Sequence, residues 1–324
     1  MATGEFELIR RYFIRSVGAT GVALGIGDDC ALVQPPQGCP LAVSMDTLVA
    51  DVHFPKNADP ELIGERALRV NLSDLAAMGA QPLWFTLALT LPKADNRWLE
   101  GFSEGLFSVA EEYGCALIGG DTTRGPLSIT IQVHGTVKAE TALLRANARA
   151  GDSVFVTGEL GDGAAAVAVI QNQLDVDKAA FKYFMSRYYR PRPRLREGEL
   201  LRGIASAAVD ISDGLMADLG HICEQSGVGA VLNVKRLPVS QTLNKLAKPK
   251  QILNWALTGG DDYQLCFTVP ASRLEKMEML LAQGKIKATP IGEIVRGTGV
   301  SCMLDGKVMP IQKTGYQHFE PPGN

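Results

Sequence analysis

Six short segments of this chain join glycine or a small polar residue to aspartate, and they constrain the fold more than any other feature. Most lie where a predicted strand ends or a helix begins. Acids at such places are available to a cleft rather than to a solvated helix face. The segments are GIGDDC (25–30), SMDT (44–47), NLSDLAAMGA (71–80), GGDTTRG (119–125), DISDGL (210–215) and TGGDDYQL (258–265).

Strands and helices alternate around these segments. In the first half, hydrophobic patterning and turn residues predict strands at 41–49, 87–92 and 128–137 and helices at 59–80 and 95–114. In the second half, we expect strands at 151–158, 229–234 and 263–270, an Ala-rich helix after a glycine-spaced loop, and helices at 192–205 and near 272–283.

The segment between the two halves, residues 138–150, has few β-branched residues and is predicted to be a connection. A length of 324 residues also favours two domains. We therefore expect an α/β (α+β) protein with an N-terminal domain at 1–140 and a C-terminal α/β domain at 148–324.

Composition excludes several classes of protein. The 32 basic and 35 acidic residues give a net charge of −3, which argues against nucleic-acid binding. No segment approaches the roughly 20 apolar residues that span a bilayer, and the N-terminus does not resemble a signal peptide. The six cysteines have no CxxC spacing, so we expect reduced thiols in a cytoplasmic protein and no zinc site.

A single Asp at a strand end is most simply a turn former or a helix cap. Six segments of one form favour a shared function. Clustered carboxylates would repel and take up protons unless cations neutralised them. Mg²⁺ prefers oxygen ligands and substrate phosphates, and glycine turns let backbone N–H groups approach phosphate oxygens. The pattern therefore indicates Mg²⁺ with a polyphosphate, although the chain has neither a GxxxxGK[ST] loop nor GxGxxG spacing.

Longer motifs built on these segments closely resemble the thiamine-monophosphate kinase family, from about residue 4 to residue 319. They include GIGDDCALV, SMDTLVADVHF, NLSDLAAMGAQPLWFTLALTLP, IGGDTTRGPLSITIQVHG, DISDGL, GGDDYQLCFTVP and GYQHF. The resemblance implies the two-domain fold of aminoimidazole ribonucleotide synthetase. It also implies a homodimer whose N-terminal sheets pair into a barrel, with ATP between the domains. The implied reaction converts ATP and thiamine monophosphate to ADP and thiamine diphosphate.

The resemblance also implies the site residues. Metal ligands, for several Mg²⁺ ions, are expected at Asp29, Ser44, the backbone of Met45, Asp46, Asp74, Asp121, Asp210 and Asp213. Nucleotide contacts are expected at Gly120, Asp121, Arg145 and Ser212, and substrate contacts at His53, Asp261 and Tyr316. Without their motifs, His53, Arg145 and Tyr316 have simpler interpretations as a loop histidine, an exposed linker arginine and a packing residue of the tail.

The chemistry of the acceptor agrees with this assignment. A phosphate monoester has a second pKa of about 6 and is largely dianionic at neutral pH, so it needs no general base. It does need relief from repulsion between two polyanions, which bridging metal ions supply. We therefore expect no catalytic nucleophile on the protein. Catalysis would consist of positioning and charge neutralisation.

One motif departs from the family pattern. Where the family commonly has GGEDYEL, this chain has Asp261 and Gln264, which shortens one side chain and removes one charge. This difference affects substrate recognition rather than reaction class. Two alternatives remain: another ATP-using enzyme of the same superfamily, and a non-catalytic sensor of nucleotides or thiamine phosphates. Each expected Asp position is filled, which favours the kinase.

Overall fold

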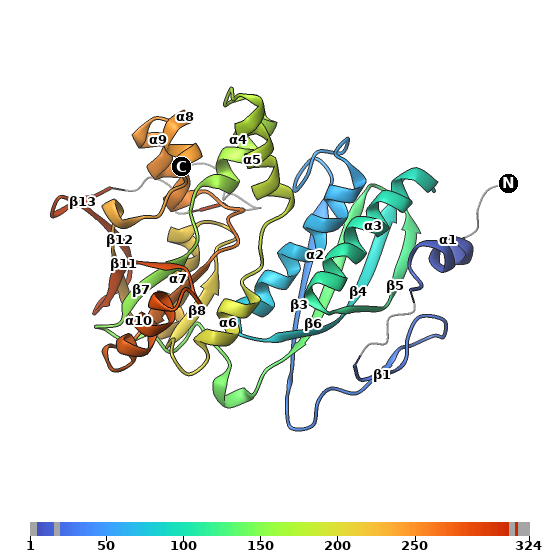
Figure 1. Ribbon diagram of the computed structural model, residues 1–324, viewed down its shortest axis with the longest axis horizontal. Helices are drawn as coiled ribbons and strands as arrows, with labels where there is room; N and C mark the ends of the chain where they lie inside the picture. Colours follow the sequence, from blue (N-terminus) through green and yellow to red (C-terminus); the bar gives the residue numbers. More distant parts are fainter. Residues whose placement is uncertain (1–4, 16–19, 311–314, 317–324) are drawn as a thin grey trace. The chain divides into compact units, whose positions relative to one another are not determined.

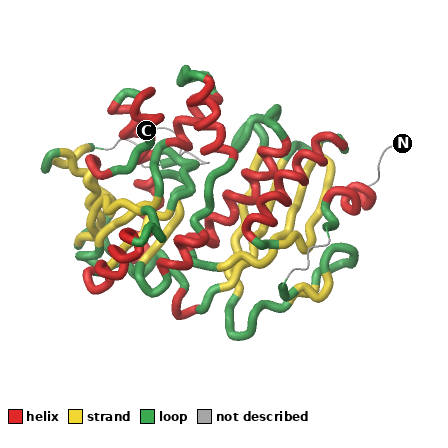
Figure 2. The backbone as a smooth tube through the Cα atoms, in the orientation of Figure 1, coloured by secondary structure: helices red, strands yellow, loops and turns green. Residues whose placement is uncertain are grey.

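The computed structural model describes residues 5–15, 20–310 and 315–316, and Figure 1 and Figure 2 show its elements. Contacts between residues divide the chain into two compact units. Unit 1 contains residues 1–75 and 80–142, and unit 2 contains residues 76–79 and 143–324. Both units mix helices and strands, which confirms the predicted α/β (α+β) class.

Unit 1 is built on a four-stranded sheet. Its strands run in the order β3 (Leu41–Val49), β6 (Ser128–Thr136), β4 (Gln81–Leu91) and β5 (Ala116–Arg124), and only the β4–β5 pair is parallel. Helices α2 (Pro60–Ala77) and α3 (Asn96–Tyr113) lie over the sheet (Figure 1). Alternate residues of β6 are fully buried, as expected for a sheet with one face against helices.

The ends of α3 follow the predicted signals. Asp95 caps the helix by accepting from the N–H groups of Arg97 and Trp98, and Gly114 ends it with φ 65°. The predicted helix at 59–80 is α2, which ends at Ala77.

Two strand predictions in unit 1 need correction. β4 begins at Gln81, whereas the prediction began at residue 87. Pro82 argues against a strand in the sequence, but the structure accommodates it at a register shift between Pro82 and Trp84. β5 was not predicted, because its glycines lower the strand propensity of residues 116–124.

A small hairpin and a short helix complete unit 1. Strands β1 (Val22–Leu24) and β2 (Leu32–Val33) pack against buried Trp84, whose Nε1 donates to the carbonyl of Thr20 at 2.9 Å. Helix α1 (Glu5–Tyr12) precedes Arg15, whose guanidinium lies 4.2 Å from the ring centroid of Phe107 on α3.

Unit 2 contains a seven-stranded sheet in which β12 and β9 form the single parallel pair. In spatial order its strands are β13 (Lys307–Met309), β12 (Gly299–Leu304), β9 (Gly229–Asn233), β11 (Ala288–Val295), β7 (Ser153–Thr157), β10 (Leu265–Val269) and β8 (Ala207–Asp210). Its helices are α4 (Asp162–Ile170), α5 (Lys178–Tyr189), α6 (Leu195–Leu201), α7 (Leu215–Ser226), α8 (Gln241–Leu246), α9 (Pro249–Thr258) and α10 (Leu274–Ala282). Short 3₁₀ turns lie at Val234–Arg236 and Ala271–Arg273 of unit 2 and at Ala139–Thr141 of unit 1.

The core of unit 2 forms where α7 and α9 pack against the sheet. Leu219 and Ile222 of α7 are fully buried together with Val154, Leu232 and Ile294 of the strands. Burying one such side chain contributes about 1.5–3 kcal/mol. The helix predicted at 192–205 is shorter in the structure. It begins at Leu195, because prolines 191 and 193 cannot continue a helix.

The six cysteines are free thiols. Four are buried, whereas Cys30 is exposed and Cys39 is half-buried. Within the described residues, none of the helices is both long enough and apolar enough to cross a membrane.

Candidate functional site

The SMDT segment lies on β3, and strand geometry separates its side chains. Successive side chains of a strand point to opposite faces, so Ser44 and Asp46 share one face while Met45 faces the other and is 59% exposed. Ser44 Oγ donates to Asp74 Oδ2 at 2.6 Å. The N–H of Asp46 donates to Asn71 Oδ1 at 3.0 Å. The structure therefore brings three predicted ligand positions together.

Asn71 is a positioning residue that the sequence analysis missed. Its side chain is fully buried, and its Nδ2 donates to the carbonyl of Ala67 one helical turn earlier. This bond orients the amide oxygen toward Asp46. The available signal was spacing, because Asn71 and Asp74 lie three residues apart on one helix face.

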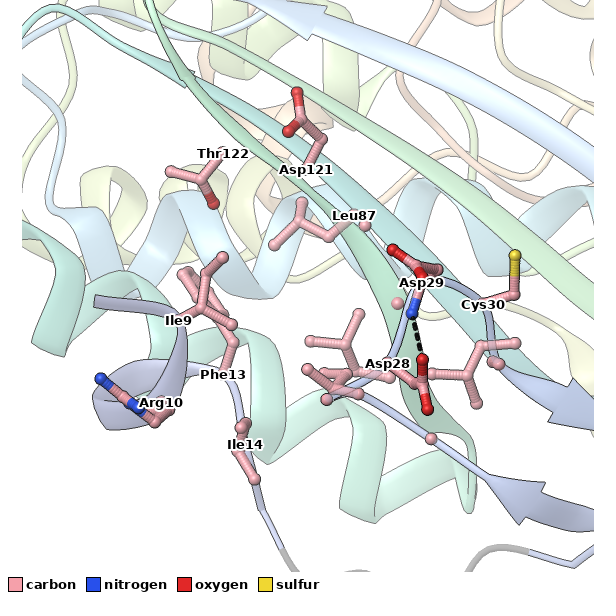
Figure 3. A pocket seen from close by; sticks show the side chains of 18 residues that line it. Ile9, Arg10, Phe13, Ile14, Asp28, Asp29, Cys30, Leu87, Asp121 and Thr122 are labelled. Atoms are coloured by element: carbon pink, nitrogen blue, oxygen red, sulfur yellow. Dashed lines mark hydrogen bonds between the residues drawn. The ribbon is translucent and has the colours of Figure 1, made fainter. Parts of the chain in front are cut away.

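A cavity of about 610 Å³ within unit 1 joins two other motifs. Asp28 and Asp29 reach it from the loop after β1, and Asp121 reaches it from β5 (Figure 3). The N–H of Asp29 donates to Asp28 Oδ1 at 2.9 Å, which fixes the turn between them. Ile9 and Arg10 of α1, together with Phe13 and Ile14 just after it, line another side of the cavity (Figure 3). Leu87 of β4 and Leu117 of β5 add apolar surface from the sheet.

Gly120 sits in the cavity wall between these two sides. Its φ of 152° is one that residues with side chains rarely adopt, and a Cβ there would lie 1.9 Å from the carbonyl oxygen of Leu87. Only glycine fits this position. Gly120 lines the cavity next to Asp121, at a position where a phosphate contact is predicted.

His53 is not among the residues that line this cavity, and Arg145 belongs to the other unit. His53 Nδ1 accepts from the N–H of Val49 at 3.0 Å, so a neutral ring carries its proton on Nε2. Arg145 belongs to unit 2, its residue is exposed, and its carbonyl accepts from Ser226 Oγ at 2.7 Å. The structure thus orients the ring of His53 and fixes the backbone of Arg145, and the ligand roles of both residues stay predictions.

Three motifs of unit 2 converge after β8. The N–H of Asp261 donates to the carbonyl of Ser212 at 2.9 Å. The N–H of Tyr316 donates to the carbonyl of Asp213 at 3.0 Å. Asp210, at the end of β8, is buried. The DISDGL turn thus contacts both the GGDDYQL loop and the start of the GYQHF motif, whose residues 317–319 lie outside the described residues.

Asp218 is a second residue that the sequence analysis missed. Its carboxylate is buried and accepts from the N–H groups of Asp213 and Gly214 at 3.2 and 3.0 Å. Burial, reinforced by the charges of Asp210 and Asp213, raises the pKa of Asp218 to about 8. The signal in the sequence was an acid in the first turn of the helix that follows DISDG.

Asp262 forms a similar contact from the GGDDYQL loop. Its carboxylate accepts from the N–H groups of Gly161 and Gly163 at 2.7 and 3.0 Å, at the start of α4. Burial raises its pKa to about 7. The GDGAAA segment (161–166), whose glycines lack the spacing of a dinucleotide turn, thus contacts the GGDDYQL loop.

Gln264 is buried in a polar network. Its Oε1 accepts from Arg194 Nε at 2.8 Å and from Thr157 Oγ1 at 3.0 Å. The guanidinium of Arg194 also forms an ion pair with Glu197 at 3.2 Å. Arg194 therefore has Glu197 as its counter-ion, although residue 264 is an uncharged glutamine.

The predicted side-chain metal ligands fall into three groups: Ser44, Asp46 and Asp74; Asp29 and Asp121; and Asp210 and Asp213. The backbone of Met45, also predicted as a ligand, lies on β3 between Ser44 and Asp46. The first two groups lie in unit 1 and the third in unit 2. Among the described residues, no three His, Cys, Asp or Glu side chains form a group that could hold a metal ion.

Comparison with known proteins identifies the family. The N-terminal domain of AIR synthase related proteins matches residues 27–137, and their C-terminal domain matches residues 149–305. The thiamine-monophosphate kinase of Escherichia coli (strain K12) is 48% identical over 325 residues, which cover 99% of this chain and all of that protein. The chain belongs to the thiamine-monophosphate kinase family. The resemblance inferred from the motifs is therefore confirmed.

Solved structures of this family share the fold. The thiamine-monophosphate kinase of Stenotrophomonas maltophilia K279a has a TM-score of 0.86 and 44% identity, over 95% of this chain and 99% of that chain. The structure of AaThiL complexed with AMPPCP and TMP has a TM-score of 0.78 and 33% identity, over 91% of this chain and 92% of that chain. The two-domain fold expected from the family is confirmed.

Proposed function

We propose that this chain transfers the γ-phosphoryl group of ATP to thiamine monophosphate, giving thiamine diphosphate and ADP. The observation that carries this proposal is full-length similarity, at 48% identity, to a thiamine-monophosphate kinase. The similar fold of a relative complexed with AMPPCP and TMP supports it. The terminal phosphate of the substrate would attack ATP directly, so the protein would supply positioning and charge neutralisation.

The oxygen donors of the site fit Mg²⁺. Carboxylates and one serine hydroxyl are hard ligands of the kind that Mg²⁺ takes in small number beside water and phosphate. We assign metal binding to the three groups of residues defined above, with the Met45 carbonyl beside them. Bound Mg²⁺ would neutralise the donor and acceptor phosphates. Asn71 and Asp218 would hold their neighbouring ligands in place through the hydrogen bonds described above.

The cavity of unit 1 suits the nucleotide. Gly120 offers an open backbone and Asp121 a carboxylate at one side, which fits a metal-bound phosphate chain. The apolar wall that includes Phe13 and Ile14 fits the nucleobase. Arg145 and Ser212 are assigned to ATP, and His53, Asp261 and Tyr316 to thiamine monophosphate, from their positions in the family motifs.

The exposed face of β3 supports a homodimer. Leu41, Val43 and Met45 alternate along this edge strand, and they are 40%, 53% and 59% exposed. Three apolar side chains in a row on one face are costly in water and indicate a covered surface. We propose that the same face of a second copy covers them, so that two sheets pair.

A coupled ADP-release assay with ATP, Mg²⁺ and thiamine monophosphate tests the function. The wild-type protein should form thiamine diphosphate, and Asp46→Asn should lose most of this activity because a metal ligand is removed. Full activity in Asp46→Asn would refute the metal assignment but keep the reaction. An absence of turnover by well-folded wild-type protein would refute the kinase and favour the sensor or another reaction of the superfamily.

A further inference from the structure

The loop at residues 259–263, between α9 and β10, has an unfavourable backbone conformation. Asp261 and Tyr263 have φ values of 67° and 48°, in the left-handed region. This region is uncommon for residues other than glycine and is costly for a bulky side chain such as tyrosine. Such a conformation persists only where surrounding contacts enforce it, and it is frequent at functional sites.

Asp262 lies between these two residues, and its carboxylate makes a contact that holds the loop in this conformation. Its two carboxylate oxygens accept from the N–H groups of Gly161 and Gly163, which lie about a hundred residues earlier in the chain. The start of α4 has no side-chain cap of its own, because its N-cap residue is Gly161. The loop is therefore joined to the first turn of α4, which Tyr183, Arg187 and Ser240 also hold through the carboxylate of Asp162.

The two segments are in close contact beyond these hydrogen bonds. A Cβ at Gly163 would lie 2.5 Å from the carbonyl carbon and oxygen of Asp261. A Cβ at Gly259 would lie 2.5 Å from the Cβ of Ala164. On its other side, the loop is attached to the DISDGL turn through the N–H groups of Asp261 and Tyr263, which donate to Ser212 and Ile211.

These contacts fix the side chain of Asp261. The hydroxyl of Tyr263 donates to Asp261 Oδ1 at 3.2 Å, so both left-handed residues contribute to one polar pair. We propose that Asp262 is a positioning residue, which holds the 259–263 loop against α4 so that Asp261 is presented to the thiamine part of the substrate. This inference rests on the proposed function, because that function assigns Asp261 to the substrate.

A separate carboxylate holds the nucleotide side. Asp218 accepts from the N–H groups of Asp213 and Gly214, so the DISDGL turn has a support that does not involve Asp262. The two contacts predict a separable effect. Removing the Asp262 carboxylate should weaken binding of thiamine monophosphate and leave ATP binding nearly unchanged.

The test compares Asp262→Asn with Asp177→Asn. Asp177 also caps a helix of unit 2, but its carboxylate accepts from the N–H of Ala180 at the start of α5, at 2.8 Å, rather than from Gly161 or Gly163. In Asp262→Asn, the new amide donor faces a backbone N–H and leaves it without an acceptor. We expect its KM for thiamine monophosphate to rise about ten-fold, with the KM for ATP within about two-fold. Asp177→Asn should keep both values.

Gly163→Ala provides a second test in case Asp262→Asn does not fold. Its Cβ would push on Asp261 while the Asp262 carboxylate stays in place, so the same split between the two KM values is expected. Equal changes in both KM values, or a lower melting temperature with unchanged KM values, would overturn the proposal and leave Asp262 as a structural cap.

Hydrogen exchange separates this inference from the proposed function. Backbone amides at 259–264 should exchange faster in Asp262→Asn than in the wild-type protein, and Asp177→Asn should leave their exchange unchanged. Unchanged exchange at 259–264 would overturn the positioning role whatever the reaction is. A wild-type protein without turnover but with faster loop exchange in the variant would refute the function and keep the ordering of the loop.

Discussion

Gly120 shows how a single residue can open a site. Because its Cβ would lie 1.9 Å from the Leu87 carbonyl, Gly120→Ala must shift β5 away from β4. We expect a loss of about 1–3 kcal/mol in the free energy of unfolding and a clear rise in the KM for ATP. Gly119→Ala is the control, because no heavy atom lies within 4 Å of its Cβ. Urea unfolding and kinetics check both variants, and equal effects at the two positions would contradict the prediction.

Helices α2 and α3 approach each other through glycines. A Cβ at Gly105 would lie 1.9 Å from the carbonyl oxygen of Glu61, and one at Gly64 would lie 2.3 Å from that of Phe102. Replacing a helical glycine by alanine normally stabilises a protein by about 0.5–1 kcal/mol. We expect Gly105→Ala to destabilise this one by about 1–3 kcal/mol, since the helices must separate. Gly220→Ala on α7 has open space around its Cβ and should give the normal gain in thermal unfolding. If Gly105→Ala and Gly220→Ala both stabilised the protein, the close approach of α2 and α3 would be refuted.

At the scale of the whole molecule, the exposed apolar face of β3 predicts that two copies of the chain assemble. Val43→Lys would place a charge in the proposed interface, where no partner for it is expected. The variant should therefore sediment as a monomer at concentrations at which the wild-type protein is a dimer. Val308→Lys introduces the same charge on β13 of unit 2, at a side chain that is 69% exposed, and it should leave the dimer intact. A dimer that persists in Val43→Lys would show that another surface is used.

Whether a feature can be predicted from the sequence depends on how far apart in the chain the interacting residues lie. The caps of α3 were predictable because Asp95 and Gly114 act within one turn of the helix. The role of Asp262 was not predictable, because its partners are backbone groups about a hundred residues away. Likewise, β5 is stabilised by pairing with β4, which local propensity cannot reveal.

By itself, the sequence determined the α/β class, the family and the motifs that carry the oxygen ligands, because these depend on local periodicity and residue order. Only the tertiary structure decided which motifs meet. It joined GIGDDC to GGDT in one cavity, Ser44 to Asp74, and the DISDGL turn to the GGDDYQL loop. The physical reason is that these contacts depend on sheet pairing and on close approach at glycines. Both bring together segments that are distant in the chain, so local sequence patterns do not reveal them.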